Sequence, residues 1–120
     1  MTRLLLPALL AVTAPAVALE GDAVFRARCA SCHAATAGAP RGAGPNLGGL
    51  MGRPVGGDPG FDYSPVLEAA RQAGETWDAP RLERFLADPE EMYPGLWMGG
   101  NGLRLASERA AVTAFLQTAR

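Results

Sequence analysis

Both cysteines and the only histidine of this 120-residue chain lie within the five residues CASCH, Cys29 to His33. Two cysteines separated by two residues suit a bound metal, a redox-active disulfide or a covalent anchor for a prosthetic group. The adjoining histidine favours the covalent anchor, because C-x-x-C-H is typical of c-type haem attachment. In that chemistry the two thiols form thioethers with the haem vinyl groups, and the imidazole of His33 is directed at the iron.

Three other interpretations of this motif need features from the rest of the chain. A thioredoxin-like disulfide belongs with an alternating pattern of strands and helices, which the sequence lacks. A structural zinc site takes four ligands, and the cluster offers three candidates. A small exported disulfide protein without haem stays open, since thiols outside the cytoplasm survive only if paired or otherwise consumed. Haem attachment is the interpretation that uses all three residues.

The N-terminal residues have the pattern of a secretory signal peptide. Arg3 supplies a short positive region, Leu4 to Val12 an apolar stretch, and Ala16-Val17-Ala18 a small-x-small cleavage pattern. An uncleaved membrane anchor is the alternative, but the segment contains two prolines and is shorter than the roughly 20 apolar residues of a spanning helix. We therefore predict a signal peptide at 1–18, cleaved after Ala18, and export to the periplasm.

The composition indicates that the remaining residues, 19–120, form one small domain with long loops. The whole chain has 15 glycines and 10 prolines, which leaves room for few helices. Lysine is absent, so all 11 basic side chains are arginines, against 12 acidic ones. Nothing in this composition resembles the basic stripe of a nucleic-acid-binding protein, and we expect no nucleic-acid partner.

Helical periodicity predicts an all-α fold with two large loops. A first helix is expected over residues 21–33, with small Gly21 one turn before Phe25 so that another helix can approach closely. The loops are expected over 34–63 and over 90–102, which are rich in glycine and proline. N-terminal caps of three later helices are expected at Ser64, Asp78 and Ser107.

The sequence also resembles the class I cytochromes c, the soluble bacterial and mitochondrial type. The resemblance runs from about Gly21 to the C-terminus and includes five landmarks in the family's order: CASCH, GPNLGGLMGR, GFDYS, TW and YPGLWM. The first landmark alone indicates haem, and the order and spacing of the others indicate the fold. The resemblance implies a cytochrome c fold, in which short helices and glycine-rich loops wrap one covalently attached haem.

The resemblance implies particular roles on the histidine side of that haem. Cys29 and Cys32 would hold the haem covalently, and His33 would be the proximal iron ligand. The carbonyl of Pro45, in GPNL, would accept a hydrogen bond from the other imidazole nitrogen. Such a bond orients the ring and makes it a stronger donor to the metal.

On the opposite side, Met98 at the end of YPGLWM would be the distal iron ligand through its sulfur. We interpret Met51 and Met92 as core residues, the usual role of methionine. The haem propionates would bring negative charge into a partly buried site, where such charge needs donors or cations. The resemblance assigns this task to Arg53, Tyr63 and Trp77.

The sequence departs from the family around Met98. Phe85 stands where many relatives have a tyrosine that can bond to the methionine sulfur, and Trp97 replaces the usual lysine. Relatives surround the exposed haem edge with lysines and dock on acidic patches, whereas this chain has Glu90 and Glu91 there. We therefore expect a partner whose docking surface is basic or mostly apolar.

An iron with both axial positions filled exchanges single electrons and has no open position for a substrate. We therefore predict a periplasmic one-electron carrier, not an enzyme, with one haem c as cofactor. Its partners are expected to be redox proteins. We expect a monomer or a transient complex, with no stable membrane insertion after cleavage. One alternative is a haem-bearing subunit of a larger periplasmic dehydrogenase or oxidase. Another is a gas sensor in which Met98 leaves the iron.

Overall fold

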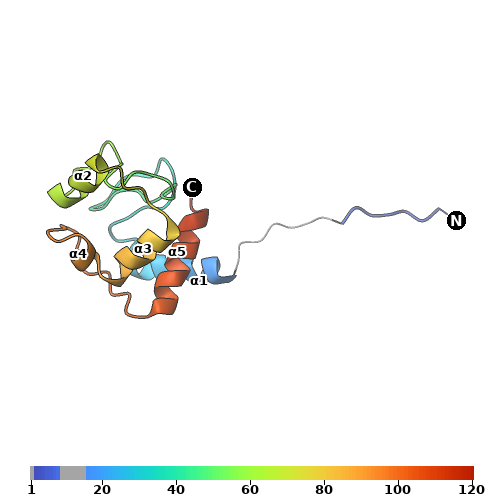
Figure 1. Cartoon of the computed structure of the whole chain (residues 1–120). Coiled ribbons are helices and arrows are strands. Elements are labelled where there is room, and N and C mark those ends of the chain that lie inside the picture. The colour runs from blue at the N-terminus through green and yellow to red at the C-terminus, as the bar shows by residue number, and fades with distance from the viewer. Residues whose placement is uncertain (1, 9–15) are drawn as a thin grey trace.

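The computed structural model describes residues 2–8 and 16–120 of the chain. Those residues contain no strand, and a single antiparallel bridge joins Pro54 to Thr76. Their five helices are α1 (Ala16–Arg28), α2 (Pro65–Gln72), α3 (Ala79–Ala87), α4 (Pro89–Met92) and α5 (Ala106–Thr118) (Figure 1). The predicted all-α fold with long connecting loops is confirmed.

Helices α1 and α5 cross and make the most extensive contact between helices of the described residues. Gly21 is buried at the crossing, where a Cβ would overlap the carbonyl oxygen of Ala111 and lie 2.9 Å from Cβ of Phe115. One turn further along, the ring of Phe25 packs on Phe115 with centroids 5.3 Å apart. The close approach predicted at Gly21 is confirmed.

The predicted bounds of the first helix, 21–33, are wrong at both ends. Helix α1 begins at Ala16, because Ala, Val, Leu and Glu are all compatible with a further helical turn, and it ends before CASCH. The predicted cleavage site after Ala18 therefore lies in the first turn of α1, where Ala18 is buried. Of the predicted signal peptide, residues 1 and 9–15 lie outside the described residues.

The three predicted caps have three different outcomes. Asp78 caps α3, accepting a hydrogen bond from the backbone nitrogen of Arg81 at 2.8 Å, as predicted. Ser64 occupies the N-cap position of α2, but its side chain makes no capping hydrogen bond. The prediction for Ser107 is wrong, because α5 has Leu105 at its N-cap and Ser107 lies inside the helix.

The second predicted loop, 90–102, lies three residues further along the chain, because its first residues belong to α4 and α5 begins only at Ala106. Asp88 ends α3 and caps this short helix, accepting a hydrogen bond from the backbone nitrogen of Glu91 at 3.1 Å. The Asp-Pro pair that stops one helix thus starts the next, since proline fits the first helical turn. The remaining connection from Tyr93 to Leu105 carries Met98.

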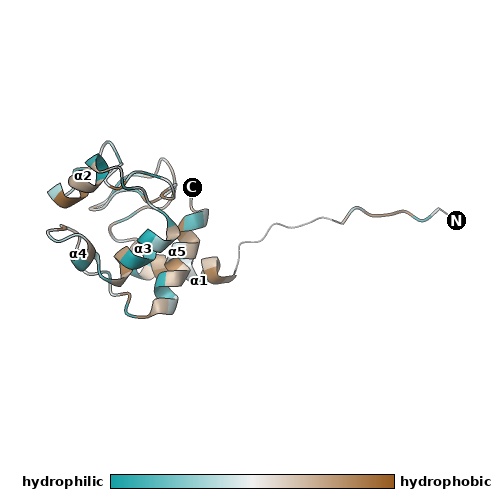
Figure 2. Cartoon of the chain, viewed as in Figure 1, coloured by the Kyte–Doolittle hydropathy of each residue, from teal (hydrophilic) through white to brown (hydrophobic). Residues whose placement is uncertain are grey.

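The core lies between α1, α3, α5 and the long loops, and its most buried side chains include Leu116 and Val112 of α5. Figure 2 shows hydrophobic and hydrophilic residues alternating along α5, as expected of a helix with one buried side. Three aromatic rings extend the core in series from Trp77 through Phe85 to Tyr93, with centroids 5.2 and 6.1 Å apart. Among the described residues, no helix is long and apolar enough to cross a bilayer.

Candidate functional site

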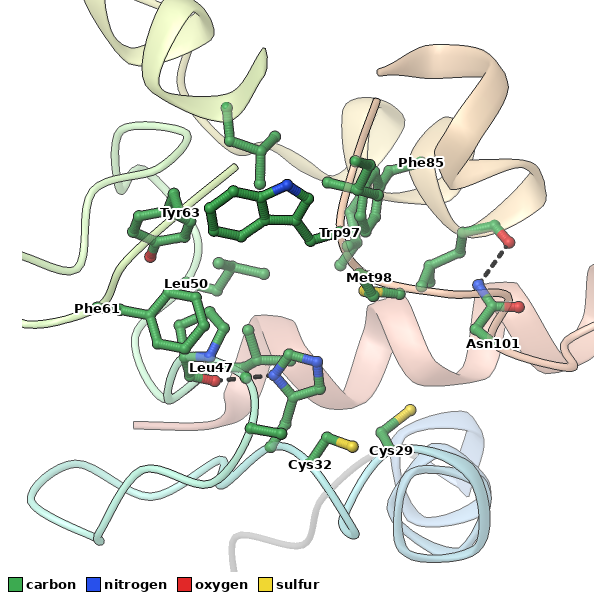
Figure 3. Close-up of a pocket in the computed structure, with 18 of the residues that line it drawn as sticks. Cys29, Cys32, Leu47, Leu50, Phe61, Tyr63, Phe85, Trp97, Met98 and Asn101 are labelled. Carbon is green, nitrogen blue, oxygen red and sulfur yellow. Dashed lines mark hydrogen bonds between the residues drawn. The ribbon is translucent and has the colours of Figure 1, made fainter. Parts of the chain in front are cut away.

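A cavity of about 450 Å³ lies between the long loops and the faces of α3 and α5. Figure 3 shows Cys29 and Cys32 on one side of it, with Met98 and Phe85 across from them. Most of the lining is apolar, and the volume is within the range of about 300–1,000 Å³ typical of small-molecule and cofactor sites. The cavity suits a large, mainly apolar ligand held from two sides.

The two cysteines are free thiols on the turn that follows α1. The backbone nitrogens of Cys32 and His33 both donate to the Cys29 carbonyl oxygen, at 3.0 and 2.9 Å, which fixes the turn. Burial raises the pKa of the Cys29 thiol, and neighbouring Cys32 raises it further. Redox-active C-x-x-C motifs have a lowered thiol pKa instead. The described residues also contain no strand, so the turn lacks the alternating strands and helices of a thioredoxin-like protein.

The imidazole of His33 is fixed by the GPNL segment. Its Nδ1 donates a hydrogen bond to the carbonyl oxygen of Pro45 at 2.8 Å, which leaves Nε2 as the ring nitrogen with a lone pair, and His33 lines the cavity. Gly44 lies against the ring, since a Cβ there would overlap Cε1 and lie 2.6 Å from Nδ1. The Gly44 nitrogen also donates to the Cys32 carbonyl at 2.8 Å. Both the loop and the ring are therefore held in one orientation.

Arg53 lines the cavity and also closes the loop around GPNL. Its Nη1 donates to the carbonyl of Asn46 at 2.6 Å, and its Nη2 donates to that of Gly48 at 2.5 Å. A guanidinium has five N–H groups, so these two bonds leave others available to a ligand. The structure thus gives Arg53 a role in shaping the loop in addition to the one predicted.

Tyr63 and Trp77 are buried side chains that line the cavity. The Tyr63 hydroxyl accepts a hydrogen bond from the backbone nitrogen of Asp58 at 3.0 Å. A tyrosine hydroxyl keeps its hydrogen at neutral pH and can donate it, and burial raises the pKa of Tyr63 further. Trp77 packs edge-on against Phe85. Both predicted side chains are brought to the cavity lining.

Sequence reasoning missed Ser64, which is 3% exposed, lines the cavity and has no hydrogen-bond partner for its Oγ. A buried hydroxyl without a partner costs roughly 1–3 kcal/mol, so its place on the wall indicates a polar group of a ligand. Ser64 lies in the GFDYS landmark directly before Pro65. That Ser-Pro pair predicts only a helix cap, so the local sequence does not indicate that the hydroxyl lines a cavity.

Among the methionines of the described residues, Met98 alone lines the cavity. Met51 and Met92 pack against the hydrophobic core, as Met98 does, but they are absent from the cavity wall. Trp97 lines the cavity beside Met98 yet is 65% exposed. The loop therefore presents a thioether to the cavity and a large aromatic side chain to the surface.

The residues on the cavity wall fit a haem. Two free thiols and an imidazole nitrogen lie on one side, a thioether lies across from them, and the unpartnered Ser64 hydroxyl suits a propionate. No three His, Cys, Asp or Glu side chains within residues 2–8 and 16–120 cluster as a metal site. The zinc interpretation of CASCH therefore lacks its remaining ligands.

Comparison with known proteins agrees with this geometry. Residues 18–120 match the family model of cytochrome c. The chain is 41% identical over 100 residues to cytochrome c of Chlamydomonas reinhardtii, covering 83% of this chain and 87% of that protein. It is 37% identical over 97 residues to cytochrome c2 of Agrobacterium tumefaciens, covering 81% and 86% of the two chains. It is also 37% identical over 100 residues to cytochrome c2 of Rhodomicrobium vannielii, covering 83% and 77%.

Proposed function

The chain belongs to the cytochrome c family, and from this premise we propose that it is a periplasmic one-electron carrier with His33 and Met98 as axial ligands of its haem iron. Proteins of this family transfer electrons to and from redox partners and are not enzymes. They bind one covalent c-type haem through cysteine side chains, and this chain has its two cysteines at 29 and 32. The ligand pair, the export and the nature of the partner are our proposals.

The observation that carries the ligand pair is the arrangement of the two donors. Met98 faces the cysteine turn, residues 29–33, across the cavity (Figure 3). The Pro45 bond occupies Nδ1 of His33, so Nε2 is the imidazole nitrogen available to iron. Histidine with methionine is a common haem ligand pair in electron carriers and gives a comparatively positive potential.

A bound haem would supply the one-electron couple of its iron. The thiols of Cys29 and Cys32 would hold it by thioether bonds. Nε2 of His33 and the sulfur of Met98 would fill both axial positions and leave no open position for a substrate. The polar side chains of the wall would donate hydrogen bonds to the haem propionates. They belong to Arg53, Tyr63, Ser64 and Trp77.

Two observations support export with a signal peptide at 1–18. Leu4, Leu5 and Leu6 are 90–92% exposed, which is unusual for the apolar residues of a folded domain. The family match begins at residue 18, next to the proposed mature N-terminus at Leu19. Since Ala18 is buried in α1, cleavage after it would have to precede folding.

The surface beside the cavity supports a basic or apolar redox partner. Trp97 is 65% exposed, and the carboxylates of Glu90 and Glu91 on α4 are exposed as well. Tryptophan is enriched at the centres of protein interfaces. The same side chain favours the second candidate function, a haem subunit held permanently by a periplasmic dehydrogenase or oxidase, and co-purification of a second chain would identify it.

The ligand pair is tested by spectra of the periplasmic protein, oxidised and reduced, for wild type and Met98→Ala. We expect haem that stays on the denatured polypeptide, and no carbon monoxide binding by the reduced wild type at neutral pH. Met98→Ala should bind carbon monoxide, whereas the control Met92→Ala should behave as wild type. Absence of covalent haem would overturn the proposal, and carbon monoxide binding by the wild type would favour the gas sensor.

A further inference from the structure

The segment that presents Met98, residues 93–101, is fastened to α3 at both of its ends. At the first end, the buried Tyr93 hydroxyl accepts a hydrogen bond from Nη1 of Arg81 at 3.2 Å and donates one to Oε2 of Glu75 at 3.4 Å. Arg81 and Glu75 also form an ion pair of 3.0 Å with each other. Arg81 lies in the first turn of α3, so this end is tied to the start of the helix.

At the second end, Nδ2 of Asn101 donates a hydrogen bond to the carbonyl oxygen of Leu86 at 2.8 Å (Figure 3). Leu86 lies in the last turn of α3, where carbonyl oxygens have no partner within the helix. Oδ1 of Asn101 accepts a further bond from the Leu103 nitrogen at 2.9 Å. The Asn101 side chain is therefore held from both sides and ties this end to the end of α3.

Between the two anchors the segment has little else to hold it. Of residues 94–100, only Leu96 is buried, and a Cβ added at Gly95, Gly99 or Gly100 would meet nothing within 4 Å. Phe85, the aromatic ring of α3 on this side of the cavity, has no hydroxyl with which to bond the Met98 sulfur. The position of the sulfur thus depends on the two ends.

We propose that Tyr93 and Asn101 are positioning residues that tie the Met98 segment to α3 and thereby set how often the sulfur leaves the iron. This inference rests on the proposed role of Met98 as a ligand. An added ligand such as imidazole binds ferric iron only when the sulfur is off, so its apparent affinity measures that fraction. Loosening either anchor should raise the fraction and with it the affinity.

The test is an imidazole titration of the ferric holoprotein, followed by its absorption spectrum. Loss of the anchoring bonds in Tyr93→Phe or Asn101→Ala should raise the apparent association constant roughly tenfold. A tenfold change corresponds to about 1.4 kcal/mol in the equilibrium between bound and released Met98 sulfur. Two controls should leave the constant unchanged: Arg84→Gln, an exposed arginine of α3, and Gln117→Ala, an exposed amide of α5.

A second set of variants distinguishes an effect on the position of the Met98 sulfur from a general loosening of the cavity. In the Met98→Ala background there is no sulfur to displace, so Tyr93→Phe and Asn101→Ala should have no effect on imidazole affinity. An effect that persists there would overturn the inference. If Tyr93→Phe fails to fold, Arg81→Gln removes the guanidinium that binds the Tyr93 hydroxyl and so weakens the same anchor from the side of α3.

Failure of the inference differs from failure of the proposed function. If Met98→Ala raises imidazole affinity but both anchor variants match wild type, the anchors do not act as proposed and the ligand pair stands. If Met98→Ala binds imidazole no more tightly than wild type, the ligand pair is wrong and the inference falls with it.

Discussion

At the scale of single residues, two buried hydroxyls of residues 2–8 and 16–120 have no hydrogen-bond partner, and their surroundings differ. Ser64 lines the cavity, whereas Thr113 of α5 does not. A buried hydroxyl that lacks a partner destabilises a fold, so each position calls for a separate explanation. We ascribe the Ser64 hydroxyl to propionate binding, and nothing in the structure explains the one on Thr113.

This difference predicts opposite responses to removal of the hydroxyl in the holoprotein. Ser64→Ala should lower the free energy of unfolding by about 1 kcal/mol, because a hydrogen bond to the haem is lost. Thr113→Val should leave the free energy unchanged or raise it, since no bond is lost. Denaturant unfolding of both variants checks this, and the same response from both would rule out the role given to Ser64.

At the scale of elements, the first long loop is crossed by an ion pair that joins its two arms. Arg41 donates to both carboxylate oxygens of Asp58, each at 2.8 Å. This hydrogen bonding to Arg41 lowers the pKa of Asp58, although desolvation opposes the shift. The Asp58 nitrogen in turn binds the Tyr63 hydroxyl, so the pair holds one of the proposed propionate partners in place.

The ion pair predicts a pH-dependent contribution to stability. The pKa of Asp58 is lower in the folded than in the unfolded chain, so the contribution is complete above the unfolded pKa. It is lost as the pH falls through the folded pKa. Arg41→Gln should therefore lower the unfolding free energy of the holoprotein at neutral pH and converge with wild type in acid. The exposed Arg104→Gln is the matched control, and a difference that persists in acid would contradict the assignment.

Several of these elements could be predicted from sequence because their signals are local. The chemistry of CASCH lies in five consecutive residues, and Asp78 caps α3 with a backbone nitrogen only three positions away. Ser107 offers the same local signal, but its helix begins earlier, because packing against α1 and α3 decides which turns are included. The free hydroxyl of Ser64 depends on where α2 sits relative to the cavity, which no local pattern contains.

At the scale of the whole molecule, charge and exposed apolar surface decide which partners can dock. The chain has 12 acidic and 11 basic side chains and a formal net charge of −1. Without Arg3, the proposed mature protein has 11 − 1 = 10 basic side chains against the same 12 acidic ones, a net charge of −2. Complementary charge mainly raises the rate of association and is screened by salt.

We therefore predict that electron transfer to a basic redox protein slows as ionic strength rises, whereas transfer to an acidic one speeds up. Trp97→Ala should lower the second-order rate constant with the basic partner roughly tenfold or more, as for an aromatic side chain at the centre of an interface. Leu105→Ala is the control, since Leu105 is 60% exposed but lies off the cavity wall. Stopped-flow rates measure both effects, and the reverse salt dependence would refute the docking model.

The two proposed iron ligands are held with unequal firmness, and this difference bears on how the protein responds to oxidation. The His33 ring is held by Pro45 and Gly44 and has almost no freedom. The Met98 sulfur lies on the segment 93–101 and depends on the hydrogen bonds at its two ends. Peroxide that converts Met98 to its sulfoxide would then act on the weaker side alone. Cys29, Cys32 and His33 would still hold the haem, while the side left by the oxidised Met98 would be open to small molecules.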